Sequence, residues 1–208
     1  LPALGEVTAC SRKELDLTDP AAIVARVRAV KPNVIVNAAA YTAVDKAESD
    51  AEQAMLVNAA GPAFLAAEAR AIGALLVHYS TDYVFDGTKT EPYVETDATN
   101  PLSVYGRSKL AGEQAIIASG ARHIILRTSW VYASRGRNFL LTMLKLGRER
   151  PELRVVDDQH GAPTWARDIA AGTAAILRHR DPADGLYHLT AAGRTTWCGF
   201  DPPAQRLH

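Results

Sequence analysis

The stretch Val34-Ile35-Val36-Asn37-Ala38-Ala39-Ala40 decides the predicted fold. Three β-branched residues in a row predict a strand that is buried on both faces, and small or polar residues end it. Asp19 and Pro20 form a helix-start signal before this strand, and an Ala-rich helical segment that Gly73 ends comes after it. Buried strands that alternate with helices are typical of a parallel sheet covered by helices.

The same alternation extends along the whole chain. Asp50 and Gln53 have the spacing of a capping box, and Gly61-Pro62 is expected to kink or split the helix that this box opens. We expect further strands at residues 7–10, 75–80, 124–126, 155–156 and 186–189, and further helices at residues 104–119, 139–148 and 167–179. The predicted class is α/β, with a doubly wound parallel sheet.

Composition excludes several classes of protein. The 208 residues contain 23 basic and 23 acidic side chains, which argues against a nucleic-acid-binding protein, since such proteins usually have a basic excess. Cys10 and Cys198 lie far apart and have no neighbouring metal ligands, so a disulfide framework or a zinc site is not expected. No apolar run approaches the ~20 residues needed to cross a bilayer. We therefore expect a cytoplasmic protein that does not contact membranes.

Polar side chains follow the carboxyl ends of three predicted strands. Ser11 and Arg12 follow the first strand, residues 37–42 follow the second, and residues 80–83 follow the third. Ligands of open α/β sheets bind at this edge. A helix that begins near residues 105–109 is expected to converge on the same place.

Tyr105 and Lys109 are four residues apart, so they share one face of that helix. An ammonium ~4 Å from the phenol would contribute roughly 4 kcal/mol and lower the phenol pKa by up to about three units. By itself the pair favours the ordinary interpretation, a solvated helix lysine and a partly buried surface tyrosine. Ser80-Thr81, at a strand end one loop earlier, favours a site for proton transfer beside a hydride carrier.

Five blocks of sequence together resemble one enzyme family, the dTDP-4-dehydrorhamnose reductases, which are extended short-chain dehydrogenase/reductases. The blocks are VNAAAYTAVDKAE at 36–48, STDYVFDG at 80–87, YGRSKLAGE at 105–113, RTSWVY at 127–132 and DDQHGAPT at 157–164. The resemblance runs from about Val7 to Trp197. It implies a Rossmann-like fold and reduction of the 4-keto group of a dTDP-linked 4-keto-6-deoxy sugar, which gives dTDP-L-rhamnose.

The resemblance also implies roles for single residues. Tyr105 would be the general acid, and Lys109 would hold the nicotinamide ribose and lower the tyrosine pKa. Thr81 would hydrogen-bond the carbonyl oxygen as charge develops there. Asp82 and Trp130 match positions that contact the substrate. A core tryptophan is the equal alternative for Trp130, since it follows a buried strand.

The same resemblance implies cofactor contacts for five residues. The alternative for residues 37–42 is an ordinary tight turn after a strand, and the alternative for Asp16 is an exposed loop acid. The matching positions are Asp16, Leu17, Ala40, Tyr41 and Thr42.

Ser11 and Arg12 bear on the choice of cofactor. An acidic residue at this strand end would bind a ribose 2′-hydroxyl, whereas arginine accommodates a 2′-phosphate. Arg12 therefore favours NADPH, with NADH as the alternative, and a solvated surface arginine is the competing interpretation.

The chain departs from the family at both ends. The first strand and its Gly-rich phosphate loop would precede Leu1, and part of the C-terminal substrate region would follow Phe200. We therefore expect an incomplete dinucleotide-binding domain at residues 1–150. Residues 151–208 are expected to hold the last core elements and part of a smaller substrate-binding region. Whether so short a chain binds cofactor or is active stays open.

The acidic pair Asp157-Asp158 is expected to position a loop rather than to bind a metal ion, and His78 is expected to be a satisfied core residue. A non-catalytic nucleotide-binding subunit, like the regulatory subunits of methionine adenosyltransferase, is one alternative function, and a reductase of another nucleotide-linked 4-keto sugar is a second. A homodimer stays open.

Overall fold

The computed structural model describes residues 1–150, 152–179 and 182–200. The chain forms two compact units. The sheet unit contains Pro2–Arg127 and strand β7 (Gly185–His188), and the aromatic unit contains the described residues from Thr128 to His179 and from Leu189 to Phe200. These units divide the chain at other positions than residue 150, and the assignment of cofactor and substrate domains stays a prediction.

The sheet unit is built on four strands in the order β1-β2-β3-β7. They are β1 (Val34–Asn37), β2 (Leu75–Thr81), β3 (His123–Thr128) and β7. Strand β1 pairs with β2 and β3 pairs with β7, both in parallel. The prediction of an α/β protein with a parallel sheet is confirmed, and the carboxyl ends of these strands gather their polar residues at one edge.

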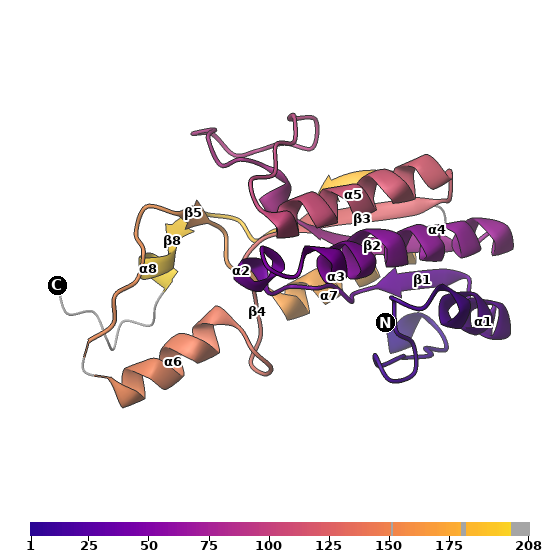
Figure 1. Cartoon of the computed structure of the whole chain (residues 1–208), viewed down its shortest axis with the longest axis horizontal. Coiled ribbons are helices and arrows are strands. Elements are labelled where there is room, and N and C mark those ends of the chain that lie inside the picture. Colours follow the sequence, from indigo (N-terminus) through magenta and orange to yellow (C-terminus); the bar gives the residue numbers. More distant parts are fainter. Residues whose placement is uncertain (151, 180–181, 201–208) are drawn as a thin grey trace. The chain divides into compact units, whose positions relative to one another are not determined.

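Three helices lie side by side against this sheet, with α4 between the other two (Figure 1). They are α1 (Pro20–Val30), α4 (Gly61–Ile72) and α5 (Val104–Ser119). Ile23 of α1, Leu65 of α4, Ile116 of α5 and Ile125 of β3 meet in one core cluster. Each fully buried aliphatic side chain contributes roughly 1.5–3 kcal/mol, so this cluster holds the helices on the sheet.

The predicted helix from Asp50 to Gly73 is interrupted by a π-helical turn. It consists of α3 (Ala51–Met55), the π turn at Leu56–Ala60 and then α4, which Gly73 ends in the left-handed conformation. Pro62 lacks an N–H and removes one helical hydrogen bond, which favours such a bulge directly before it. The predicted capping box is wrong, because Asp50 makes no capping bond and accepts a hydrogen bond from the Tyr41 hydroxyl instead.

Two predicted strands are also wrong. Residues 7–10 form no strand and are exposed, and residues 155–156 lie in irregular structure. The carbonyl of Val156 accepts one hydrogen bond, from the Cys198 amide. A β-rich sequence becomes a strand only when a partner satisfies its backbone groups, and within residues 1–150, 152–179 and 182–200 no strand pairs with either segment.

A buried ion pair joins α5 to β3. Both guanidinium contacts of Arg127 go to the Glu113 carboxylate, at 2.6 and 2.9 Å. The Arg127 side chain is 6% exposed and that of Glu113 is 1% exposed. Such a bidentate pair fixes the angle at which α5 lies on the sheet.

The close approach of α5 to the π turn depends on a glycine. A Cβ added to Gly112 would lie 2.1 Å from the Asn58 carbonyl oxygen, which belongs to the backbone and cannot rotate away. We expect Gly112→Ala to destabilise the protein by at least ~1 kcal/mol, although alanine favours a helix by about 1 kcal/mol. Urea unfolding followed by circular dichroism measures this loss.

Gln114→Ala, on the exposed face of the same helix, is the matched control. It should change stability by less than ~0.5 kcal/mol. Equal stability of the Gly112→Ala and Gln114→Ala proteins would mean that α5 does not pack tightly on the π turn.

The aromatic unit contains short paired strands and three helices. Strand β4 (Val131–Tyr132) pairs in parallel with β6 (Thr164–Trp165), and β5 (His160–Gly161) pairs antiparallel with β8 (Thr195–Thr196). The helices are α6 (Phe139–Glu149), α7 (Ala166–Arg178) and α8 (Trp197–Phe200). The predicted helices at 139–148 and 167–179 are thus confirmed within a residue or two.

Candidate functional site

Helix α5 begins at the site and brings two candidate residues to it. The Ser103 hydroxyl caps the helix by accepting a hydrogen bond from the Gly106 amide at 3.0 Å. A Cβ on Gly106 would lie 2.2 Å from the Tyr83 carbonyl oxygen, so only glycine allows the helix to start this close to the segment after β2. This approach places Tyr105 beside that segment.

Thr81, Asp82 and Tyr105 come together as the sequence predicts. The Thr81 hydroxyl donates to an Asp82 carboxylate oxygen at 3.0 Å and also hydrogen-bonds the Tyr105 phenol. The Tyr105 ring packs edge-on against the ring of Tyr83, with 5.4 Å between the centroids. The phenol is therefore held by one hydroxyl and one aromatic neighbour.

The charge state of Tyr105 differs from the one the sequence suggests. Burial raises the pKa of Tyr105 to about 12, and the hydrogen bond between Tyr105 and Thr81 opposes that rise only in part. The predicted lowering of the Tyr105 pKa is wrong here, because burial raises this pKa and Lys109 is not among the groups that shift the phenol. Tyr105 therefore carries its proton at neutral pH and can act as a proton donor.

The Asp82 carboxyl has a pKa closer to neutral than an ordinary aspartate. Burial raises the pKa of Asp82 to about 6, while hydrogen bonds from Thr81 and from the backbone lower it. Near neutral pH the carboxylate is mostly charged and accepts the Thr81 proton.

Lys109 lies one helical turn after Tyr105 and is only 2% exposed. Its Nζ donates to the Tyr79 carbonyl at 2.7 Å and lies 3.2 Å from His78 Nε2. Burial lowers the pKa of Lys109 to about 8, and the charge of Glu113 opposes this effect. Lys109 is thus bound to β2 and is not a solvated surface lysine.

The predicted cofactor-binding segment Ala40–Thr42 is tied to α5 by Asn58. The Asn58 side chain accepts from the Tyr41 amide at 2.8 Å and donates to the Tyr41 carbonyl at 3.0 Å. It also donates to the Ser108 hydroxyl, next to Lys109, at 2.9 Å. Sequence reasoning missed Asn58, although a fully buried asparagine within an Ala-rich helical run is a signal that could have revealed it.

The predicted residues of the first loop are held mostly by local bonds. Ser11 and Arg12 are exposed, and the Arg12 guanidinium pairs with Asp16 at 3.2 Å. Asp16 also accepts from the backbone amide and the hydroxyl of Thr18. Leu17 belongs to the hydrophobic core. The cofactor contacts of these four residues stay predictions.

Trp130 belongs to the aromatic unit. Its ring stacks on Trp197 with 3.6 Å between the centroids, and a Cβ added to Gly161 would lie 2.4 Å from the indole. Trp197 thus covers one face of the indole, and Gly161 lies close to the ring. A substrate contact of Trp130 stays a prediction.

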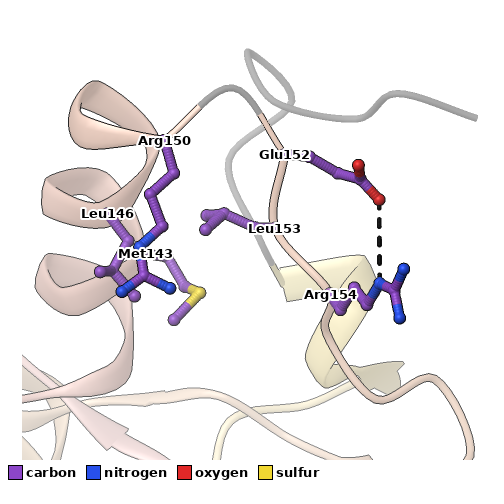
Figure 2. Close-up of a pocket in the computed structure, with 6 residues that line it drawn as sticks. All are labelled: Met143, Leu146, Arg150, Glu152, Leu153 and Arg154. Atoms are coloured by element: carbon purple, nitrogen blue, oxygen red, sulfur yellow. Dashed lines mark ion pairs between the residues drawn. The ribbon is translucent and has the colours of Figure 1, made fainter.

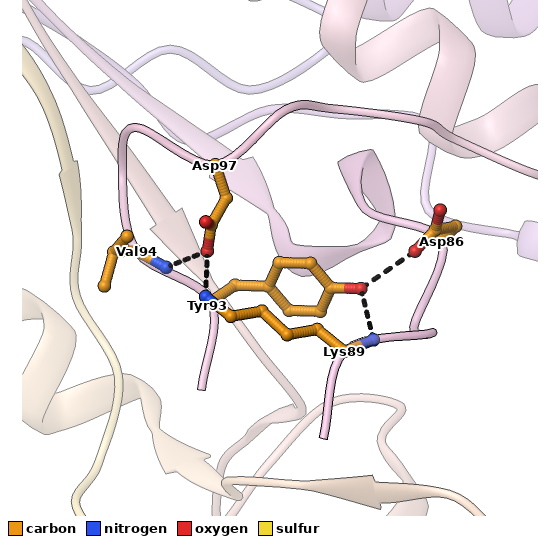
Figure 3. A network of polar contacts seen from close by, with 5 residues as sticks. All are labelled: Asp86, Lys89, Tyr93, Val94 and Asp97. Atoms are coloured by element: carbon orange, nitrogen blue, oxygen red, sulfur yellow. Dashed lines mark hydrogen bonds and ion pairs between the residues drawn. The ribbon is translucent and has the colours of Figure 1, made fainter. Parts of the chain in front are cut away.

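The loop that follows the site is held by its own hydrogen bonds (Figure 3). The Asp86 carboxylate accepts from Thr88, Asn100 and the Tyr93 hydroxyl, and these bonds, led by the one from the Thr88 amide, keep the pKa of Asp86 far below its usual range. Lys89 pairs with Asp97 at 2.6 Å. The loop therefore has a defined shape without a ligand.

A separate cavity of about 400 Å³ lies within the aromatic unit (Figure 2). Arg154 and Glu152 form an ion pair of 3.8 Å at one side of it. Its lining residues come from α6 and the segment after it, and are Met143, Leu146, Arg150, Glu152, Leu153 and Arg154. None of the residues predicted to act in the site lines this cavity.

The described part of the chain is residues 1–150, 152–179 and 182–200. Within them no group of three or more His, Cys, Asp or Glu side chains is arranged to hold a metal ion. In the same part of the chain, no helix combines the length and the apolar character needed to cross a bilayer.

A family model described as the RmlD substrate binding domain matches residues 2–204. The dTDP-4-dehydrorhamnose reductase of Burkholderia thailandensis is 53% identical over 207 residues, which are 96% of this chain and 70% of that protein. The enzyme of the same name from Escherichia coli K12 is 52% identical over 89% of this chain and 63% of its own length. The chain thus spans between about three fifths and seven tenths of these relatives.

Solved structures give the same result. The dTDP-4-dehydrorhamnose reductase of Bacillus anthracis in complex with NADP superimposes with a TM-score of 0.93, is 37% identical, and the match covers 97% of this chain and 72% of that one. The corresponding protein of Clostridium acetobutylicum gives a TM-score of 0.90 at 42% identity, over 94% and 69% of the two chains. The predicted Rossmann-like fold class is confirmed by this likeness.

Proposed function

The chain belongs to the family described as the RmlD substrate binding domain, and on that premise we propose that its protein reduces the 4-keto group of dTDP-4-dehydro-L-rhamnose to give dTDP-L-rhamnose. One observation carries the proposal. A phenol that keeps its proton is held against a threonine hydroxyl, and a buried lysine follows one helical turn later. A ketone that accepts hydride needs such a proton donor.

NADPH is the proposed cofactor, and the residues of the sheet unit fit it. Lys109 Nζ uses two of its bonding directions on Tyr79 and His78, which leaves one N–H for a ribose hydroxyl. The exposed guanidinium of Arg12 is suited to a 2′-phosphate, and Ala40 and Thr42 offer small side chains and backbone for adenosine. NADPH supplies the hydride when it is bound.

The residues of the chain carry the proton chemistry. Tyr105 Oη gives its proton to the sugar oxygen while the carbonyl carbon becomes a C–H centre, so a secondary alcohol forms and the phenol becomes a phenolate. Thr81 Oγ1 orients the phenol, and its proton, which points to Asp82 in the free protein, would turn to the developing alkoxide and donate a hydrogen bond to it. Asp82, which binds the Thr81 hydroxyl, orients that hydroxyl and is the proposed contact to the sugar.

The two cysteines support a cytoplasmic location. Cys10 and Cys198 are both free, which fits the reducing cytoplasm that we propose for this reaction.

The test is an NADPH oxidation assay on the product of the complete gene. With dTDP-4-dehydro-L-rhamnose we expect NADPH consumption that matches the dTDP-L-rhamnose formed, and slower turnover with NADH. A second nucleotide-linked 4-keto sugar runs in parallel, and a preference for it would change the assigned substrate. NADPH binding without oxidation in the presence of either sugar would instead identify a non-catalytic nucleotide-binding subunit.

A further inference from the structure

His78 is a polar residue in the otherwise apolar first part of strand β2, and it is fully buried. Its Nδ1 lies 3.0 Å from Asn37 Nδ2, on the neighbouring strand β1, and its Nε2 lies 3.2 Å from Lys109 Nζ on α5. Both ring nitrogens therefore face another nitrogen. In each contact one nitrogen must donate and the other must accept.

The contact with Asn37 decides which ring nitrogen holds the proton. Asn37 Oδ1 accepts a hydrogen bond from the Ala39 amide at 3.2 Å, so the Nδ2 group, which can only donate, faces the imidazole. Nδ1 of His78 must then accept. Burial holds the pKa of His78 well below its usual range, so the ring is neutral, and since Nδ1 accepts, its one proton sits on Nε2.

The Nε2–H group consequently points at Lys109 Nζ. An ammonium has only donors and could not accept this bond, whereas an uncharged amine has a lone pair for it and still donates to the Tyr79 carbonyl at 2.7 Å. These hydrogen bonds form one chain, which runs from Ala39 through Asn37, His78 and Lys109 to Tyr79. Every donor in it faces an acceptor only when Lys109 is uncharged.

We propose that His78 is a positioning residue that, held as its Nε2–H tautomer by Asn37, donates a hydrogen bond to Lys109 Nζ and so favours the uncharged amine. The contacts that carry this assignment lie within the sheet unit and join three of its elements. The effect on turnover, but not the effect on Lys109 itself, rests on the reductase function proposed above.

Other charged groups near Lys109 do not cancel this effect. Glu113, one turn further along α5, favours the ammonium, but its carboxylate is bound on both oxygens by Arg127 of β3. From β2 the facing groups are His78 and the Tyr79 carbonyl. Burial and His78 act in the same direction, and a lysine that changes charge near neutral pH can carry a proton into and out of the site.

The first measurement needs no substitution. Nitrogen-15 NMR of the complete protein without cofactor should show His78 with an unprotonated Nδ1 and a protonated Nε2 throughout pH 6–9. A protonated Nδ1 at neutral pH would overturn the proposal, because Nε2 would then be an acceptor for an ammonium.

The second measurement titrates Lys109 by NMR in protein labelled at the lysine side chains, with Lys109→Met used to identify its signal. His78→Gln can turn its carboxamide oxygen toward Nζ, so the midpoint for Lys109 should rise by at least about one pH unit. Asn37→Asp should move the proton of His78 to Nδ1 and raise the same midpoint while the imidazole stays in place. His123→Gln, a histidine of β3 that bonds the Ala121 carbonyl, is the matched control and should change nothing.

An unchanged Lys109 midpoint in both His78→Gln and Asn37→Asp would overturn the proposal. In the NADPH oxidation assay, the pH profile of kcat/KM for His78→Gln should shift by the same amount as the NMR midpoint. The NMR titrations use neither NADPH nor sugar, so a protein without reductase activity would refute the proposed function while the titrations still decide the role of His78.

Discussion

Tyr105→Phe is expected to lower kcat/KM for the keto sugar at least ~100-fold, since positioned proton donors usually contribute between 10² and 10⁴ in rate. The substitution removes the one hydroxyl that the structure holds against Thr81 and keeps the ring that packs on Tyr83. Substrate binding should change little, so the loss should appear in kcat. Steady-state NADPH oxidation by the complete protein measures both parameters.

Tyr83→Phe is the matched control, because it deletes a phenol hydroxyl from the ring that packs against Tyr105. It should reduce kcat/KM by less than ~10-fold, since no proton transfer passes through it. Equal rates for the wild-type and Tyr105→Phe proteins would remove Tyr105 from the mechanism. Because burial raises the pKa of Tyr105 to about 12, the phenol keeps its proton through pH 10, and no loss of rate in that range should come from its ionisation.

Arg127→Leu is expected to cost roughly 3–5 kcal/mol of stability, the usual loss when one partner of a buried ion pair is removed. The substitution leaves the Glu113 carboxylate 1% exposed and without the guanidinium that binds both its oxygens. It also removes the guanidinium that lies 5.0 Å from the centre of the Phe85 ring. Urea unfolding of the complete protein measures the change.

Two controls separate the charge from the loss of packing. The double variant with Glu113→Leu and Arg127→Leu leaves no unpaired charge, so it should recover most of the stability. Lys46→Met removes the exposed ion pair with Asp50, in which the Lys46 side chain is 69% exposed, and should cost no more than ~1 kcal/mol. An Arg127→Leu loss as small as that of Lys46→Met would show that the buried pair does not hold α5 on the sheet.

The helices were predictable because their end signals are local. The predicted bounds of α5 are those of the structure, since Ser103 caps its start and Gly120 adopts the left-handed conformation at its end. Residues 7–10 have an equally good local pattern but no partner strand. Strand pairing depends on residues far away in the sequence, and a local pattern cannot supply it.

Some features of the site were predictable from the sequence and others were not, for the same reason. The spacing of Tyr105 and Lys109 on one helix, together with Thr81 at a strand end, was enough to predict that they share a site. The partners of Lys109 were not predictable, because Tyr79 and His78 lie about thirty residues earlier in the chain. The predicted direction of the Tyr105 pKa shift was also wrong, because this shift depends on how deeply the fold buries the phenol.

The sheet cannot be completed until the ribosome has made strand β7. Ile124 of β3 pairs with Gly185 of β7, about sixty residues later, and the whole of α6 and α7 is made in between. At about 5–20 residues per second, a ribosome needs roughly 3–12 s to make that interval. During those seconds the outer edge of β3 has no partner strand, so a nascent chain at this stage is open to pairing with a neighbouring one, and slower translation beyond Arg127 should lower the yield of native protein.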